Sequence, residues 1–327
     1  MNTLIITKND VAEILTPSLA IKAVQNAFKA YSSNQADNPT KTYLNFKKGD
    51  LRTMPAYIHG QGLNIAGIKS INVHPENRKY NLPTVMGIIT LIDPKNGLPL
   101  AILDGTYLTS MRNGAAGALA ARLLSRKSAR VAGVVGCGTQ ARANLICTME
   151  VRKLNAIKVW KRTRKSDSAR RFCNWAEETY NLDTSIWSDI DEVTTGVDIL
   201  VTTTPSRKPI VNEVSPGTHI NALGADAPGK QEINPRILKQ AKLVIDDWAQ
   251  ASHSGEINVP LSRRQLYKKH IYGAFGEIIG GKKKGRISDK DITLFDSSGL
   301  AIQDVACGYA VYTKFREKTD VTQVEFF

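Results

Sequence analysis

The amino-acid sequence predicts an α/β protein with two domains, a doubly wound parallel sheet and a mixed α+β domain. Two observations predict this fold class. From residue 129 onward, short apolar strands alternate with helical segments, which is the pattern of βαβ units. Before that residue, a helix is followed by short strands that Gly, Pro and Asn-Gly signals separate. A length of 327 residues is also typical of two domains.

The mixed region begins with a helix, because apolar residues recur at helical spacing over residues 11–32. Strand character follows in four short segments, at residues 42–46, 65–73, 84–92 and 99–103. Residues 93–97, Asp-Pro-Lys-Asn-Gly, predict a hairpin between the last two of them. A helix rich in small residues is then expected over 107–124.

The second region predicts a parallel sheet. Its strands are expected at residues 130–135, 157–160, 199–203, 219–223, 243–246 and 292–295. Helices are expected over 141–150 and 167–180, in gaps between these strands. A last helix over 301–316 follows the sheet, and we expect it to return to the mixed domain.

The composition excludes several classes of protein. The net charge is +14, but the basic residues are scattered and no aromatic residues interleave with them, so we expect no nucleic-acid binding. No apolar run approaches the ~18–20 residues of a membrane helix and the N-terminus is not a signal peptide, so we expect a cytoplasmic protein without membrane contact. The four cysteines lie far apart and no histidine has metal-ligand spacing, so we expect neither disulfides nor a metal site.

The first strand of the parallel sheet leads into residues 136–141, Gly-Cys-Gly-Thr-Gln-Ala, which have the G-x-G-x-x-A spacing of a Rossmann-type turn. Gly136 permits the tight turn, and Gly138 lets the backbone approach a pyrophosphate. The helix that starts at Thr139 and Gln140 directs backbone N–H groups toward the phosphates. The sequence therefore predicts a dinucleotide cofactor.

The ribose end of this site is basic. An NAD site usually has an acidic residue about 20 residues after the turn, at the end of the second strand. Here that place is occupied by Lys161, Arg162 and Thr163, whose side chains suit a 2′-phosphate. We therefore predict NADP(H) as the preferred cofactor, with NAD(H) as the alternative. The competing interpretation is that these are surface cations of a basic protein.

Polar and small residues follow other strands of the predicted sheet, where the doubly wound fold binds ligands. These further cofactor candidates are Thr202, Thr204, Asn221, Ala222, Leu223 and Ser297. Ordinary turn chemistry explains each of them equally well.

Segments spread over the whole chain carry a further pattern. They are Gly49-Asp-Leu-Arg52-Thr-Met-Pro55, Lys69-Ser-Ile-Asn-Val-His74-Pro75, Leu82-Pro-Thr84-Val, Arg112-Asn-Gly-Ala-Ala, Gly136-Cys-Gly-Thr-Gln140, Asn221-Ala-Leu-Gly-Ala-Asp226-Ala-Pro-Gly-Lys230-Gln-Glu232, Gly255-Glu-Ile and Asp296-Ser-Ser-Gly299-Leu-Ala-Ile-Gln-Asp304. Through them the sequence resembles the ornithine cyclodeaminase/mu-crystallin family, nearest its archaeal-type alanine dehydrogenase branch.

The resemblance implies a homodimer that acts on a small amino, oxo or imino acid. It implies a substrate-binding and dimerisation domain of residues 1–114 with 304–327, and a Rossmann dinucleotide domain of residues 115–303. Lys69 would be the acid/base residue, with Arg52 and Arg112 near the substrate carboxylate and Asp226 assisting proton transfer. Thr84, Arg112, Lys230 and Ser297 would lie near the cofactor. Without the resemblance, the favoured interpretation is that Lys69 faces solvent on an alternating strand.

Several activities compete within the resemblance. The most favoured is alanine dehydrogenase, which makes L-alanine from pyruvate and ammonia. The alternatives are reduction of a cyclic imino acid such as pyrroline-2-carboxylate or a ketimine, then ornithine cyclodeaminase, then a low-turnover NADPH-binding protein. Arg52 stands where ornithine cyclodeaminases carry an acidic residue, which disfavours a cationic side chain. The run from Asp226 to Lys230 favours the alanine dehydrogenase branch.

Overall fold

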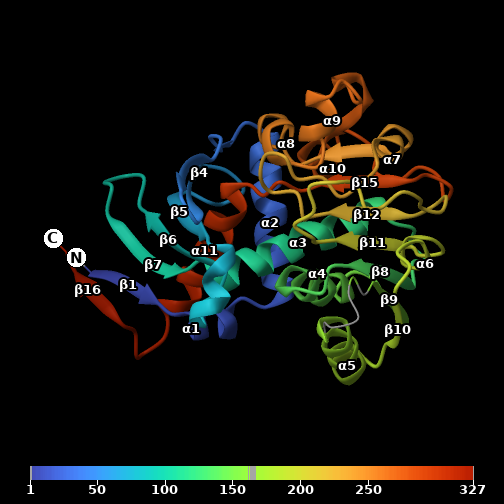
Figure 1. Cartoon of the computed structure of the whole chain (residues 1–327). Helices are drawn as coiled ribbons and strands as arrows, with labels where there is room; N and C mark the ends of the chain where they lie inside the picture. Colours follow the sequence, from blue (N-terminus) through green and yellow to red (C-terminus); the bar gives the residue numbers. More distant parts are fainter. Residues whose placement is uncertain (1, 161, 163–166, 327) are drawn as a thin grey trace. The chain divides into compact units, whose positions relative to one another are not determined.

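The computed structural model describes residues 2–160, 162 and 167–326 (Figure 1). The chain divides into two compact units, which we call unit 1 (Met1–Arg112 with Leu300–Phe327) and unit 2 (Asn113–Gly299). The sequence analysis placed the corresponding boundaries after residues 114 and 303. Each unit is built around its own sheet.

Unit 1 holds a mixed sheet of eight strands in the order β16-β1-β7-β6-β5-β4-β2, with β3 paired to β4. The strands are β1 Asn2–Ile6, β2 Ala36–Asp37, β3 Thr42–Phe46, β4 Gly49–Ile58, β5 Ile65–Val73, β6 Val85–Ile92, β7 Pro99–Asp104 and β16 Gln323–Glu325. Strands β6 and β7 are antiparallel and joined by the predicted turn, where Gly97 has a φ of +79°. The strand β4 is absent from the sequence prediction, because Arg52 and Pro55 interrupt its apolar alternation.

The helices of unit 1 are α1 Lys8–Ile14, α2 Pro17–Ser32, the 3₁₀ turn η1 Pro75–Tyr80, the first part of α3 Thr106–Leu124, and α11 Ala301–Phe315. The prediction of one helix over 11–32 is wrong. Thr16 accepts a hydrogen bond from the backbone N–H of Leu19, and Pro17 occupies the first helical position, so a new helix begins there. The C-terminal helix α11 packs against α2 and against strands β4, β5 and β6.

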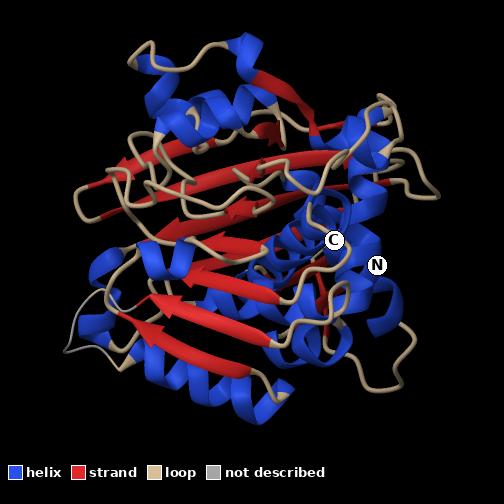
Figure 2. Cartoon of the chain, turned by 90° about the vertical axis from the view of Figure 1, so that its right-hand side faces the viewer, coloured by secondary structure: helices blue, strands red, loops and turns tan. Residues whose placement is uncertain are grey.

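Unit 2 contains a parallel sheet of eight strands in the order β10-β9-β8-β11-β12-β15-β13-β14. The strands are β8 Val131–Val135, β9 Ala156–Trp160, β10 Asp183–Trp187, β11 Ile199–Thr202, β12 His219–Ala222, β13 Lys242–Ile245, β14 Ile271–Ala274 and β15 Thr293–Asp296. Figure 2 shows these strands as arrows with helices beside them. The six predicted strands are present, and β10 and β14 extend the sheet at its edges.

The helices of unit 2 are α4 Thr139–Met149, α5 Ser168–Tyr180, α6 Asp191–Thr194, α7 Pro235–Gln240, α8 Trp248–Ser254, α9 Asn258–Ser262 and α10 Phe275–Ile279, with the 3₁₀ turn η2 Lys268–His270. Successive residues of β11 belong to different cores. Ile199 and Val201 join the core that contains Phe172 of α5, whereas Leu200 joins the core that contains Leu238 of α7. Both faces of the sheet are therefore covered, which confirms the predicted doubly wound fold class.

None of the helices in the described part of the chain combines the length and apolar character that a membrane crossing requires.

Candidate active site

Lys69 lies on the buried face of β5. The buried residues of this strand alternate with half-buried ones, and Lys69 shares the inner face with Ile65, Gly67 and Ile71. It stands opposite Met54 of β4, and its side chain is only 1% exposed. The interpretation that Lys69 faces solvent is therefore wrong. Isoleucines occupy both faces of β5, so the apolar pattern alone did not indicate which face is inside.

The ammonium of Lys69 is paired with a carboxylate from the last helix. Lys69 Nζ lies 2.7 Å from Asp304 Oδ2, and the other oxygen, Oδ1, accepts a hydrogen bond of 2.9 Å from Arg112 Nε. Arg112 also donates from Nη1 to Gln303 Oε1 at 2.9 Å, and Lys69 Nζ lies 3.4 Å from Thr109 Oγ1. Lys69, Arg112 and Asp304 are 1%, 4% and 0% exposed. The structure thus brings together two predicted residues through a third that the sequence analysis had given no function.

This environment changes the acidity of Lys69. The pKa of Lys69 is lowered from 10.5 to about 7, chiefly by burial and also by the charges of Arg112 and Lys41, whereas Asp304 acts in the opposite direction. A lysine with a pKa near neutrality can both give and take a proton at physiological pH. The physical requirement for an acid/base residue is therefore met at Lys69.

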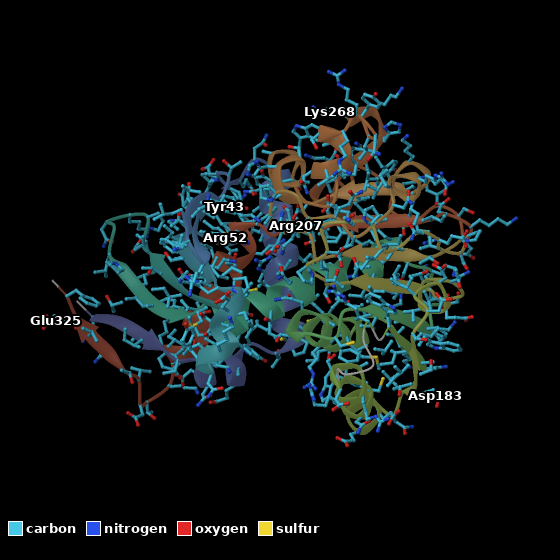
Figure 3. The ribbon with its side chains drawn as sticks, in the orientation of Figure 1. Tyr43, Arg52, Asp183, Arg207, Lys268 and Glu325 are labelled. Atoms are coloured by element: carbon cyan, nitrogen blue, oxygen red, sulfur yellow. The ribbon has the colours of Figure 1, made fainter. Side chains whose placement is uncertain are left out.

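Arg52 lies on the same face of β4 as Met54, the residue opposite Lys69. Its guanidinium is held in two ways. Nε and Nη2 donate to the two oxygens of Asp50 at 2.7 and 3.1 Å, and the group lies over the ring of Tyr43, 5.4 Å from its centre. Figure 3 labels both Arg52 and Tyr43. Arg52 is only 6% exposed, so these contacts fix the position of its guanidinium.

The turn after β8 has the geometry that the sequence predicts for a dinucleotide site. Gly136 has a φ of +104°, and a Cβ there would come within 2.9 Å of Thr203 Oγ1. Gly138 is the exposed N-cap residue of α4, and in the described structure no side chain caps this helix end and nothing would meet a Cβ at Gly138. Thr139 is also exposed, whereas the Gln140 amide oxygen accepts from Asn113 Nδ2 at 3.0 Å. The uncapped N–H groups of α4 fit a pyrophosphate.

The ribose end is described only in part. Arg162 is exposed, whereas Lys161 and Thr163 lie outside the described residues. The strand ends are better defined. Ser297, after β15, is 5% exposed, and its hydroxyl has no hydrogen-bond partner among the described residues. A buried hydroxyl without a hydrogen-bond partner is consistent with a polar ligand that binds there.

Other predicted cofactor residues are used inside unit 2. Thr202 is fully buried and donates to Glu232 at 2.8 Å, and Thr204 donates to the same carboxylate from its N–H and its hydroxyl, both at 2.7 Å. Asn221 is also fully buried, and it bonds to Gly117 O and to the His219 ring, each at 3.0 Å. Ala222 and Leu223 are buried beside it. The polar side chains of Thr202, Thr204 and Asn221 are bound within unit 2, so we expect these residues to contact a cofactor through their backbone atoms.

The remaining candidates lie in loops. Asp226 and Lys230 follow β12 and form an ion pair with each other. The backbone oxygen of Lys230 accepts from Asn258 Nδ2 at 2.9 Å. Thr84 is half-buried just before β6, and its carbonyl accepts from the His74 N–H at 2.8 Å.

The sequence analysis missed the acidic partners of the site, namely Asp50, Asp304 and Glu232. A signal existed for Asp304, because it is a charged residue inside the apolar stretch that begins α11. Within the described residues, no group of three or more His, Cys, Asp and Glu side chains is arranged to hold a metal ion.

Comparison with known proteins identifies the family of this chain. The model of the ornithine cyclodeaminase/mu-crystallin family matches residues 1–319. The chain belongs to this family. It is 45% identical to the alanine dehydrogenase of Archaeoglobus fulgidus over 331 aligned positions, which cover 100% of this chain and 99% of the relative.

Two solved structures of family members are similar over their whole length. One is an archaeal alanine dehydrogenase dimer with bound NAD, with a TM-score of 0.95, 45% identity and full coverage of both chains. The other is the Δ¹-pyrroline-2-carboxylate reductase of Thermococcus litoralis with NADH and L-proline. It has a TM-score of 0.94 and 31% identity, and the match covers 98% of this chain and 100% of that one.

Proposed function

We propose that this protein is an NAD(P)-dependent oxidoreductase that interconverts pyruvate plus ammonia and L-alanine. The observation that carries the proposal is the buried cluster of Lys69, Arg112 and Asp304. It combines a lysine that titrates near neutral pH with a guanidinium fixed for a carboxylate. The 45% identity to an alanine dehydrogenase over the whole chain supports the choice of substrate.

Unit 2 would hold the dinucleotide. The N–H groups at the start of α4 would bind the pyrophosphate, and Ser297 would donate to the cofactor. When bound, the nicotinamide supplies or accepts the hydride. Gly136 keeps the turn tight enough for this contact, because a side chain there would meet Thr203.

Unit 1 would hold the substrate. Arg52 and Arg112 would bind its carboxylate, each already directed by an acidic partner. Arg52 pairs with Asp50, whereas Lys69 and Arg112 share Asp304, so these five groups together carry a net positive charge when Lys69 is protonated. An excess of positive charge favours a monocarboxylate and disfavours the second amino group of ornithine.

Lys69 would move the proton. In the direction of alanine synthesis, ammonia adds to the carbonyl carbon of pyruvate, and Lys69 Nζ donates a proton to the hydroxyl that leaves as water. In the reverse direction the neutral Nζ takes that proton from the attacking water. Asp226 would orient the attacking group, and this remains a prediction from the family resemblance.

A second candidate is the reduction of a cyclic imino acid. The relative solved with NADH and L-proline supports it, since the match covers nearly all of both chains. A cyclic imine carries the same carboxylate next to its C=N bond, so Arg52 and Arg112 could bind it in the same way. Ornithine cyclodeamination and ligand binding with little turnover rank below these two.

The cofactor preference is a separate proposal. The two solved relatives hold NAD or NADH. We propose that this chain prefers NADP(H), because basic residues stand where an NAD site has an acid, and Arg162 is exposed there. NAD(H) would also be accepted.

We also propose a homodimer, since one solved relative is described as a dimer. Unit 1 presents large apolar side chains to solvent, among them Leu44, Phe46 and Ile88, which are 58%, 44% and 52% exposed. Leu44 and Phe46 are two residues apart on one strand and so share a face, and neighbouring exposed apolar side chains are typical of interaction surfaces. Sedimentation velocity would measure the mass directly.

The deciding experiment follows the oxidation of NADPH, and of NADH in parallel, with pyruvate and ammonium near neutral pH, where part of the Lys69 population is protonated. Loss of absorbance only when ammonium is present is expected. Activity on pyrroline-2-carboxylate without activity on pyruvate plus ammonium would replace the first candidate by the second. Lys69→Ala should abolish turnover and leave cofactor binding intact, and unchanged turnover would exclude Lys69 as the acid/base residue.

A further inference from the structure

We propose that Asp304 is the positioning residue of this site, a single buried carboxylate that sets the positions of both Lys69 and Arg112. The inference rests on the proposed function, because it assigns Lys69 and Arg112 to the substrate. It adds a residue to that machinery from a third element, the C-terminal helix α11.

The geometry divides the carboxylate between two partners. One oxygen lies 2.7 Å from Lys69 Nζ and the other 2.9 Å from Arg112 Nε, so the two cations are held at opposite ends of one rigid group. Lys69 comes from β5, Arg112 from α3 and Asp304 from α11. Three elements that are far apart in sequence are therefore locked together at the site.

The carboxylate itself is held in place. Asp304 is 0% exposed and lies in the first turn of α11, where the helix dipole favours a negative charge. The adjacent residue Gln303 accepts from Arg112 Nη1 at 2.9 Å, which fixes the guanidinium plane as well. Residues 303 and 304 thus control the direction of Arg112 together.

Asp304 also controls the charge of Lys69. The groups that act on the Lys69 ammonium in unit 1 are Arg112 from α3, Lys41 from the segment before β3, and Asp304. Burial and both cations lower the pKa of Lys69, whereas Asp304 raises it. Without the carboxylate, Lys69 would lose its proton below neutral pH and could no longer donate it during alanine synthesis.

The test compares Asp304→Asn with Asp304→Glu. Asp304→Asn keeps the shape but removes the charge, so the pKa of Lys69 should fall by roughly 1–3 units, the effect of one nearby opposite charge. The alkaline limb of the pH profile for pyruvate amination should move to lower pH by the same amount. Asp304→Glu keeps the charge on a longer side chain, so the limb should stay in place while kcat falls at least tenfold.

A measurement that does not depend on turnover separates this proposal from the proposed function. The ¹³Cε resonance of Lys69, assigned by its loss in Lys69→Arg, reports the titration directly in the full-length protein. If neither pyruvate nor a cyclic imine is converted, the proposed function fails while this titration still tests Asp304. An unchanged Lys69 titration in Asp304→Asn would overturn the proposal.

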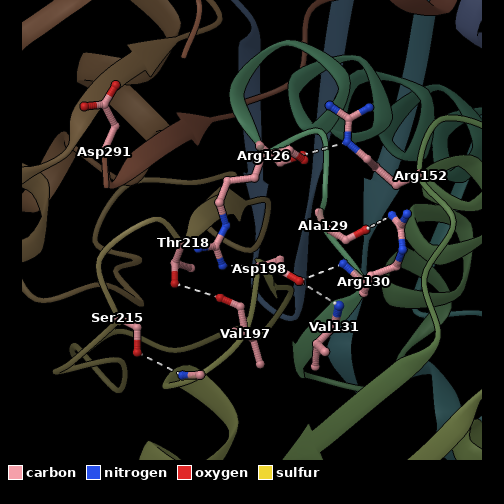
Figure 4. Close-up of polar contacts among 12 residues, drawn as sticks. Arg126, Ala129, Arg130, Val131, Arg152, Val197, Asp198, Ser215, Thr218 and Asp291 are labelled. Carbon is pink, nitrogen blue, oxygen red and sulfur yellow. Dashed lines mark hydrogen bonds and ion pairs between the residues drawn. The ribbon is translucent and has the colours of Figure 1, made fainter. Parts of the chain in front are cut away.

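Asp198→Asn is the matched control. Asp198, in unit 2, is paired with Arg126 and accepts from the backbone N–H groups of Arg130 and Val131 at 2.7 and 3.0 Å (Figure 4). Removing its charge should lower stability without moving the Lys69 titration. If Asp304→Asn does not fold, Asp304→Glu decides alone, and a wild-type kcat in that variant would overturn the proposal.

Discussion

Replacing Lys69 by methionine should make the protein more stable at neutral pH while it abolishes turnover. Methionine has a similar length and no charge, so it can fill the same buried space on β5. The pKa of Lys69 is about 7 in the folded chain, against an ordinary value of 10.5. At about 1.36 kcal/mol per pKa unit, keeping the protonated lysine buried costs about 5 kcal/mol.

The difference in stability between Lys69→Met and the wild-type protein should depend on pH. The folded pKa lies below the unfolded one, so between pH 7 and 10.5 the unfolded chain binds more protons than the folded chain. Lys69 should therefore make the free energy of unfolding of the wild-type protein rise as the pH increases from 7 to 10.5. Lys69→Met lacks this titrating group. Its gain in the free energy of unfolding over the wild-type protein should therefore be largest at pH 7 and below and should vanish toward pH 10.5.

Urea unfolding followed by circular dichroism at pH 6, 7, 8 and about 9.5 would measure the effect, since the midpoint reports stability when the slope is unchanged. Lys95→Met, at an exposed lysine of the β6–β7 turn, is the control and should change the free energy of unfolding by less than about 0.5 kcal/mol. A Lys69→Met protein that is less stable than wild type at pH 7, or an advantage independent of pH, would refute the reasoning.

Three further predictions follow from the binding residues. Asp50→Asn removes the negative charge that holds Arg52 in place. KM for pyruvate should rise by roughly tenfold, the equivalent of one charged hydrogen bond, with a smaller change in kcat. An unchanged KM would show that Arg52 does not need Asp50 to bind the substrate. Gly136→Ala places a Cβ within 2.9 Å of Thr203 at a φ of +104°, and the strain of about 1–3 kcal/mol should weaken dinucleotide binding in a fluorescence titration. Arg162→Ala should weaken NADPH binding by about tenfold and leave NADH binding unchanged, whereas an equal loss for both cofactors would count against recognition of a 2′-phosphate.

The sequence by itself determined the local structure and the dinucleotide turn. The alternation of apolar strands and helices predicts unit 2 because each βαβ unit carries its own signal within a short stretch of chain. The same holds for the turn from Gly136 to Gly138 and for the hairpin between β6 and β7. Local chemistry was also overlooked once, at Thr16 and Pro17, where a cap and a proline end one helix and begin another.

Only the tertiary structure decided the chemistry of unit 1. Lys69 and Asp304 are 235 positions apart, as their residue numbers give, and no local pattern relates them. The apolar residues on both faces of β5 leave the direction of Lys69 open, and packing of α11 against this strand fixes it. The pKa of Lys69 depends on that burial and on charges from α3 and α11, so the sequence could name the residue, but only the folded chain gives it the acidity that the reaction requires.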